Sequence, residues 1–329
     1  MKKHLLTFVL IILLITFADA QNPSRPKLNQ TEWNIIGDAQ FEDFKGQETL
    51  VLNGKATLKN VEFTNGIIEV DIYANSKRSF AGILFRKQGN SMEEVYMRMH
   101  KSRQVDAVQY SPTFNNELTW QLYREYQAQV TFKHQGWNKL RLEVNHSRLD
   151  IFVNNEKVLT VLNMRTESKS GELGLFALYP NRFANFRYIQ KKVPSQNNEF
   201  MPKTKDAHLI SDWSITPSRP YQEQKFKLTD SLARKSFLVR TDETGLLPIS
   251  KYLSKTSRGN FEENEESYTI ASTIINSKNE HTEVFSFDFS DKAIVFLNDR
   301  LIFKGNNSFR AKGVQYMGHL NVDTNQSVS

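Results

Sequence analysis

The chain of 329 residues contains no cysteine. Neither a disulfide framework nor a thiolate zinc site is therefore available, and stability must come from buried apolar surface. The histidines do not provide a zinc site either, because none of them shows a His-x-His or His-Glu-x-x-His spacing. Zinc is set aside. Calcium stays open, since Asp, Asn and carbonyl oxygens in loops bind it without a local signature.

Signature loops of nucleotide and esterase chemistry are also missing. There is no Gly-x-Ser-x-Gly or phosphate-cradling loop, and the 14 glycines are spread singly. Charge of one sign is not concentrated either, because 43 Lys and Arg are scattered among 36 Asp and Glu, for a net charge of +7. This pattern predicts a solvated surface and no nucleic-acid partner.

Long apolar runs are confined to the N-terminus. A short basic start, Lys2-Lys3-His4, precedes the apolar residues 5–17 and the small-residue end Ala18-Asp-Ala20. This order predicts a signal peptide over residues 1–20 and a secreted or periplasmic location. No later segment approaches 18 apolar residues, so we expect no transmembrane span in the mature chain.

Helical periodicity of useful length is absent after residue 20, whereas apolar residues alternate with period two in short runs between turn-forming residues. The chain is therefore predicted to be all-β. Asn154-Asn155 is predicted as a hairpin tip. Strands at 137–144, 149–153, 171–175 and 183–188 are predicted to follow one another as a meander that closes a sandwich.

Two regions of strands are separated by a polar stretch that contains Pro194 and Pro202. We therefore predict a first sandwich over 28–192, a linker over 193–207 and a second, smaller β-sandwich over 208–329. The second series of strands is expected at 210–215, 236–240, 268–275, 283–287 and 293–297. Residues 318–329 are polar, which predicts either an incomplete C-terminus or a frayed tail.

The segments Gly66–Asp71, Phe80–Arg86 and Tyr96–His100 resemble strands of the concanavalin A-like lectin/glucanase superfamily. Within it, the first region is most similar to laminin-G-like domains and to the three-keto-disaccharide hydrolase domain. The resemblance implies a jelly-roll sandwich and a carbohydrate or glycoconjugate ligand. Residues 289–298 and 301–305 resemble galactose-binding-like modules, in which this hairpin is structural, so Asp291 and Asn298 are expected to cap a turn.

A candidate ligand site follows from strand parity. If Val95, Met97 and Met99 face the core, the residues between and after them project from the opposite face. Aromatic rings stack on the C–H face of a sugar, and planar side chains hydrogen-bond its hydroxyl groups. Together with nearby groups of the same kind, the predicted binding residues are Arg86, Tyr96, Arg98, His100, Gln109, Tyr110 and Trp120.

Two rival functions stay open beside this lectin hypothesis. Laminarinase-type glycosidases of the superfamily carry Glu-x-Asp-x-x-Glu on one strand, and Glu69-Val-Asp71 begins that spacing. Ala74 stands where the second glutamate is required, so an enzyme would need a third acid, Glu143 or Glu117, brought close by folding. Because laminin-G-like sandwiches also bind proteins, an extracellular protein-interaction module is the third reading.

Overall fold

The computed structural model describes residues 22–75, 77–193, 209–223, 226, 228, 235–254, 266–280, 282, 284–307 and the backbone of 326–328. The predicted signal peptide and nearly all of the predicted linker lie outside these ranges.

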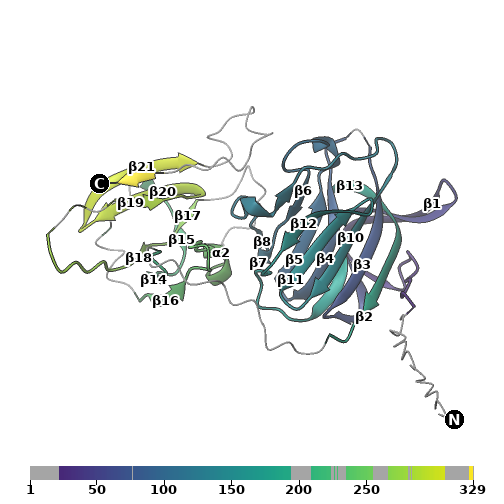
Figure 1. Cartoon of the computed structure of the whole chain (residues 1–329), viewed down its shortest axis with the longest axis horizontal. Helices are drawn as coiled ribbons and strands as arrows, with labels where there is room; N and C mark the ends of the chain where they lie inside the picture. Colours follow the sequence, from purple (N-terminus) through teal and green to yellow (C-terminus); the bar gives the residue numbers. More distant parts are fainter. Residues whose placement is uncertain are drawn as a thin grey trace, which may run out of the picture.

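The first region is one antiparallel sheet of 13 strands that curls into a sandwich (Figure 1). Its main path runs in the order β12-β11-β10-β3-β13-β4-β5-β6-β9, and β1, β2, β7 and β8 pair beside it. The strands are β1 (Trp33–Phe44), β2 (Gln47–Phe63), β3 (Gly66–Tyr73), β4 (Phe80–Gln88), β5 (Ser91–Met97), β6 (Val108–Tyr110), β7 (Thr113–Phe114), β8 (Glu117–Leu118), β9 (Gln127–Ala128), β10 (Trp137–Asn145), β11 (Arg148–Val153), β12 (Glu156–Val161) and β13 (Gly171–Gln190).

Alternate apolar residues of both halves of this sheet meet in one core. Strand β3 contributes Ile68, Val70 and Ile72, and strand β5 contributes Val95 and Met97, all fully buried. Burial of these side chains supplies the stability that disulfides do not, at about 25 cal/mol per Å² of apolar surface. The predicted all-β sandwich is confirmed.

The predicted closing meander is wrong in one respect. Residues 171–175 and 183–188 belong to a single strand, β13, which lies between β3 and β4 and does not follow β12 in space. Its first half pairs with β4 and its second half with β3, and its pairing registers shift between Ala177 and Asn181 and between Ala184 and Arg187. Such irregularities bend a strand, so β13 passes from one half of the sandwich to the other.

Two-residue turns close the tight hairpins as the sequence predicts. Asn154 and Asn155 both have positive φ, 51° and 72°, between β11 and β12. Asn298 and Asp299 do the same, at 48° and 64°, between β20 (Asp291–Leu297) and β21 (Arg300–Asn307). Positive φ at both central residues matches the right-handed twist of the strands, and Asn and Asp tolerate it best after glycine. The predicted hairpin tip at Asn154-Asn155 is confirmed, and Asn298 lies in a turn as expected.

The second region consists of small separate sheets in the parts that the structure describes. Three strands pair in the order β16-β14-β18, and β15-β17, β19-β22 and β20-β21 pair two by two. A single sandwich over 208–329 therefore stays a prediction. The remaining elements are β14 (Asp212–Ile215), β15 (Arg219–Pro220), β16 (Phe237–Arg240), α2 (Ile249–Tyr252), β17 (Ser267–Tyr268), β18 (Ala271–Ser272), β19 (Phe285–Phe287) and β22 (Gln326–Val328).

Candidate functional site

The candidate site lies on the outer face of the half-sandwich formed by β2, the first half of β13, β4, β5 and β6. Strand register aligns residues of this face in rows across the strands. One row contains Lys55, Phe176, Gly82, Tyr96 and Gln109, each paired with the next on a neighbouring strand. The alternation that turns Val95 and Met97 into the core is what turns Tyr96 to this face.

A buried hydrogen-bond network forms the floor of this face. The Tyr96 hydroxyl donates to Gln109 Oε1 at 3.0 Å, and Arg98 donates to the same oxygen at 2.5 Å. Arg98 also forms an ion pair of 2.6 Å with Asp106, which Lys101 joins at 2.5 Å. These side chains are almost fully buried, and such paired charges hold one another in place. The network fixes a rigid base.

Aromatic rings lie over and beside this floor. Phe80 packs edge-on against Tyr96 at 6.2 Å between ring centroids and against His100 at 5.3 Å. Tyr179 packs on the other side of Phe80 at 6.3 Å and is 41% exposed. The Arg78 guanidinium lies 5.5 Å from the Phe80 centroid and 5.8 Å from that of Tyr179. An exposed ring beside cationic donors therefore faces solvent.

Lys55 reaches across this face to a buried carboxylate. Lys55 is on β2 and Glu94 on β5, with β13 and β4 between them, yet Lys55 Nζ lies 4.0 Å from Glu94 Oε1. On the intervening strands, Phe176 is the register partner of Lys55 and Leu84 that of Glu94, and Gly174 and Gly82 are the adjacent positions on the same face. Glycine is required at position 82, because a Cβ there would lie 1.9 Å from the Val95 carbonyl oxygen.

The Glu94 side chain is fully buried. Burial raises its pKa above the ordinary value, and Lys55 and the hydrogen bond from Thr113 oppose this only in part. Glu94 Oε2 accepts the Thr113 hydroxyl at 2.9 Å, whereas Oε1 has no hydrogen-bond partner among the described residues. This oxygen is enclosed, and its charged neighbour is the Lys55 ammonium group.

Four of the predicted binding residues come together here. Tyr96, Arg98 and Gln109 form the network itself, and the His100 ring lies half-buried at its edge, where Nδ1 accepts the Ser79 N–H at 3.2 Å. We predicted exposed contact groups, but Tyr96, Arg98 and Gln109 are buried. Trp120 is half-buried, and its main-chain oxygen accepts a hydrogen bond from Gln109 Nε2 at 2.6 Å.

Two predicted residues lie elsewhere. Tyr110 is next to Gln109 and therefore points to the opposite side of β6, into the core, where its hydroxyl donates to Glu93 at 2.6 Å. Arg86 follows Phe85 with φ of 49° at a register shift, and its buried guanidinium donates to the Thr64 carbonyl oxygen. The bulge breaks the parity on which the prediction rested.

The two carboxylates of the glycosidase hypothesis lie on the outer face of the other half of the sandwich. Glu69 is ion-paired with Arg187 and, at 3.3 Å, with Arg141. The Asp71 carboxylate accepts hydrogen bonds from Lys139 Nζ at 2.8 Å and from Asn185 Nδ2 at 2.8 Å. Because the apolar core separates these groups from the network around Tyr96, the structure does not join them into one site.

Several residues of the outer face were missed by the sequence reasoning. They are Lys55, Phe80, Glu94, Phe176 and Tyr179. Glu94 carried a usable signal, since it precedes Tyr96 by two positions on the same strand. Lys55 carried none, because its approach to Glu94 depends on the order of four strands.

The second region braces the segment that borders this face. Residues 111–126 contact the site through Thr113 and Trp120, and Asn115 donates to the Ser250 carbonyl oxygen at 2.8 Å. Ser290 donates to Gln121 at 3.1 Å. The segment is thus held from both sides.

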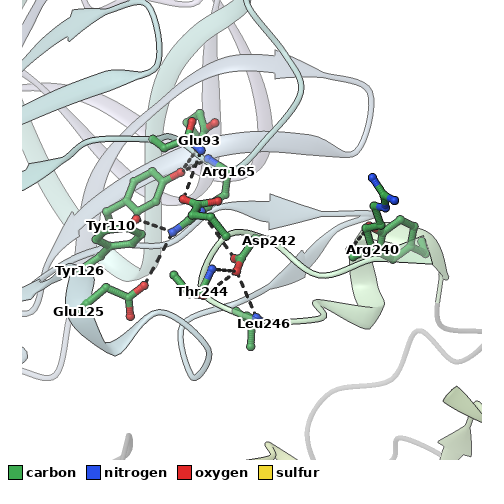
Figure 2. Close-up of polar contacts among 12 residues, drawn as sticks. Glu93, Tyr110, Glu125, Tyr126, Arg165, Arg240, Asp242, Thr244 and Leu246 are labelled. Atoms are coloured by element: carbon green, nitrogen blue, oxygen red, sulfur yellow. Dashed lines mark hydrogen bonds and ion pairs between the residues drawn. The ribbon is translucent and has the colours of Figure 1, made fainter. Parts of the chain in front are cut away.

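Arg165 is the central residue of this brace (Figure 2). It donates to the Tyr126 hydroxyl at 2.7 Å and is ion-paired with Glu243 and, at 3.6 Å, with Asp242. Burial by itself lowers its pKa, but Tyr126 and the two carboxylates raise it above the ordinary value, so Arg165 is charged. Its main-chain N–H also donates to Tyr110, which ties the brace to the core.

The described residues form neither a cluster of metal ligands nor a membrane-spanning helix. Among the described residues, no three His, Asp or Glu side chains gather as a metal site, so calcium binding stays a prediction. No helix in the same parts of the chain is long and apolar enough to cross a membrane.

Comparisons with known proteins concern the first region. Residues 27–190 match the family described as 3-keto-alpha-glucoside-1,2-lyase-like domain, which agrees with the resemblance stated above. No curated protein matches the sequence.

Three solved structures show the range of similarity. A carbohydrate-binding module, CBM66, from Bacillus subtilis is 15% identical with a TM-score of 0.39, covering 49% of this chain and 98% of its own. A Bacillus subtilis protein of galectin-like fold is 10% identical with a TM-score of 0.36, covering 51% and 98%. Caenorhabditis elegans galectin LEC-6 is 15% identical with a TM-score of 0.32, covering 46% and 96%.

The acid stability of the protein is expected to depend on His100. Burial, and then the nearby Arg78 guanidinium, lowers the pKa of His100 from 6.5 to about 4. As the pH falls from about 6.5 to about 4, the unfolded chain takes up this proton and the folded chain does not, so the free energy of unfolding decreases. His100→Asn, which keeps an acceptor for the Ser79 N–H, should flatten this decline in urea unfolding. The exposed control His134→Asn should not, and equal slopes would contradict the assignment.

The brace is expected to contribute measurably to stability. Arg165→Gln removes the partner of two carboxylates from a buried position and should lower the free energy of unfolding by about 3 kcal/mol. Lys251→Gln is a matched control, because Lys251 also joins the two regions, through Glu167 at 3.1 Å, but in an exposed pair worth less than about 1 kcal/mol. Similar losses in both variants, measured by urea unfolding, would refute a special role for Arg165.

Proposed function

We propose that the protein binds a carbohydrate without covalent chemistry on the outer face of β2, β13, β4, β5 and β6. The observation that carries the proposal is the layered arrangement at this face. An exposed ring, Tyr179, and the half-buried Phe80 lie beside the cationic group of Arg78, and Lys55 lies on the same face beside Glu94. Behind them the network of Tyr96, Arg98 and Gln109 keeps the layer rigid.

A sugar ring suits these groups chemically. Its C–H face packs on an aromatic ring, while its hydroxyl groups need donors and acceptors at the rim. Arg78, Lys55 and His100 supply such groups. The matching family name contains an alpha-glucoside, and we accordingly propose a glucoside as the ligand class.

A catalytic role is the second candidate, and Glu94 favours it. The matching family is described as lyase-like. When a glycosidic bond breaks, the departing oxygen takes up a proton, and a carboxylic acid with a raised pKa is a suitable donor. Lys55, 4.0 Å away, is placed to stabilise the carboxylate that this donation leaves. Glu69 and Asp71 are not part of this candidate, since both are committed to ion pairs.

The proposed setting is extracytoplasmic, as the N-terminal sequence predicts. There the ligand would be an external glycan or glycoconjugate. The protein-interaction module predicted as the third reading is the expected result if no glycan binds.

Binding is expected to depend on Tyr179. A glycan array of the full chain, with and without calcium, identifies the ligand, and titration calorimetry measures its affinity. Tyr179→Ala removes the exposed stacking ring and should weaken binding about tenfold, or about 1.4 kcal/mol. Phe237→Ala removes a ring of similar exposure, 40%, from β16 in the second region and should change nothing. Equal affinities of wild type and Tyr179→Ala would overturn this placement of the site.

The catalytic candidate is tested separately with Glu94→Gln. The substitution keeps the size and the Thr113 contact but supplies no titratable proton. If Glu94 is a proton donor, release of product from alpha-glucosides and from their 3-keto derivatives should fall at least about 100-fold while binding persists. Wild-type protein that binds glycans and leaves every one intact would restrict the function to binding.

A further inference from the structure

A hollow lies on the outer face of the other half of the sandwich. It has a volume of about 200 Å³ and opens between the N-terminal segment at Pro23 and strands β3, β10 and β13. The antiparallel bridge between Ser24 and Tyr188 holds that segment against β13. The segment therefore forms one wall of the hollow, above the face of the sheet. Its lining is Pro23, Ile67, Glu69, Arg141, Arg187, Tyr188 and Ile189.

Two guanidinium groups flank one carboxylate in this hollow. Arg187 on β13 and Arg141 on β10 are both register partners of Glu69 on β3, so the three side chains form a row across three strands. Both arginines use Nε for Glu69. The Glu69 side chain is only 10% exposed. It lies between the two partly exposed guanidinium groups and orients both of them.

The outward nitrogens of these forks are largely uncommitted. Arg187 makes no other polar contact within the described residues, and its side chain is 37% exposed. One terminal nitrogen of Arg141 is ion-paired with Glu143. The Arg141 guanidinium carbon lies 4.9 Å from the ring centroid of Phe152, its register partner on β11. The row thus continues from charged donors to a half-buried aromatic ring.

We propose that this hollow binds a carboxylate-bearing sugar, with the carboxylate on Arg187 and Arg141. Paired N–H groups of arginine match the two oxygens of a carboxylate, and the apolar walls at Ile67 and Ile189 accept the body of a sugar ring. The proposal is independent of the neutral-glycan site, because the core of the sandwich separates the two faces.

Calorimetry of the full chain at low salt tests the site with trigalacturonate and, as the neutral counterpart, galactotriose. Trigalacturonate should bind and galactotriose should not bind at this hollow. Arg187→Gln and Arg141→Gln should each weaken trigalacturonate binding at least tenfold. Arg148→Gln is the control, because Arg148 is exposed on β11 and its ion-pair partner among the described residues is Asp150 alone. Acetate competing as well as trigalacturonate would overturn the sugar part of the proposal.

Further variants separate a failed site from a failed fold. Arg187→Lys keeps the positive charge but loses the fork, so it should fold normally and still lose most of the affinity. Tyr179→Ala should bind trigalacturonate like the wild type, which separates this site from the neutral-glycan site. If trigalacturonate does not bind, or binds unchanged to both glutamine variants, the row is an ordinary cross-strand charge ladder and the proposal fails.

Discussion

The rest of the structure depends on the pairing of β13 with strands of both halves of the sandwich. Its 20 residues pair with β2, β3 and β4, and register shifts redirect it between these partners. One strand therefore places Phe176 and Tyr179 on one outer face and Arg187 and Tyr188 beside the hollow on the other. Both candidate sites inherit their geometry from the same backbone.

Polar groups on the two faces are organised differently. Around Arg98 the charges are buried and ion-paired with one another, so they act as a scaffold for the aromatic rings above them. Around Glu69 the charges are partly exposed, and the arginines keep nitrogens that no described residue uses. The first arrangement favours recognition by shape and stacking, and the second favours recognition of an anion.

Much of the fold and part of the site could be predicted from sequence. Period-two alternation placed Val95 and Met97 in the core and Tyr96 on the outer face, because strand parity is a local property. Parity failed at Arg86, where a bulge adds a residue, and it could not reveal that β13 lies between β3 and β4. The Lys55–Glu94 pair depends on that strand order, so no local pattern contains it.

The segment 111–126 contacts Glu94 and Gln109 on one side and the second region on the other. A ligand that orders this segment would favour docking of the second region, and docking would favour the ligand to the same degree, because coupling free energies are reciprocal. The two regions then work as one thermodynamic unit. Occupancy of the candidate site would then shift the docking equilibrium of the second region.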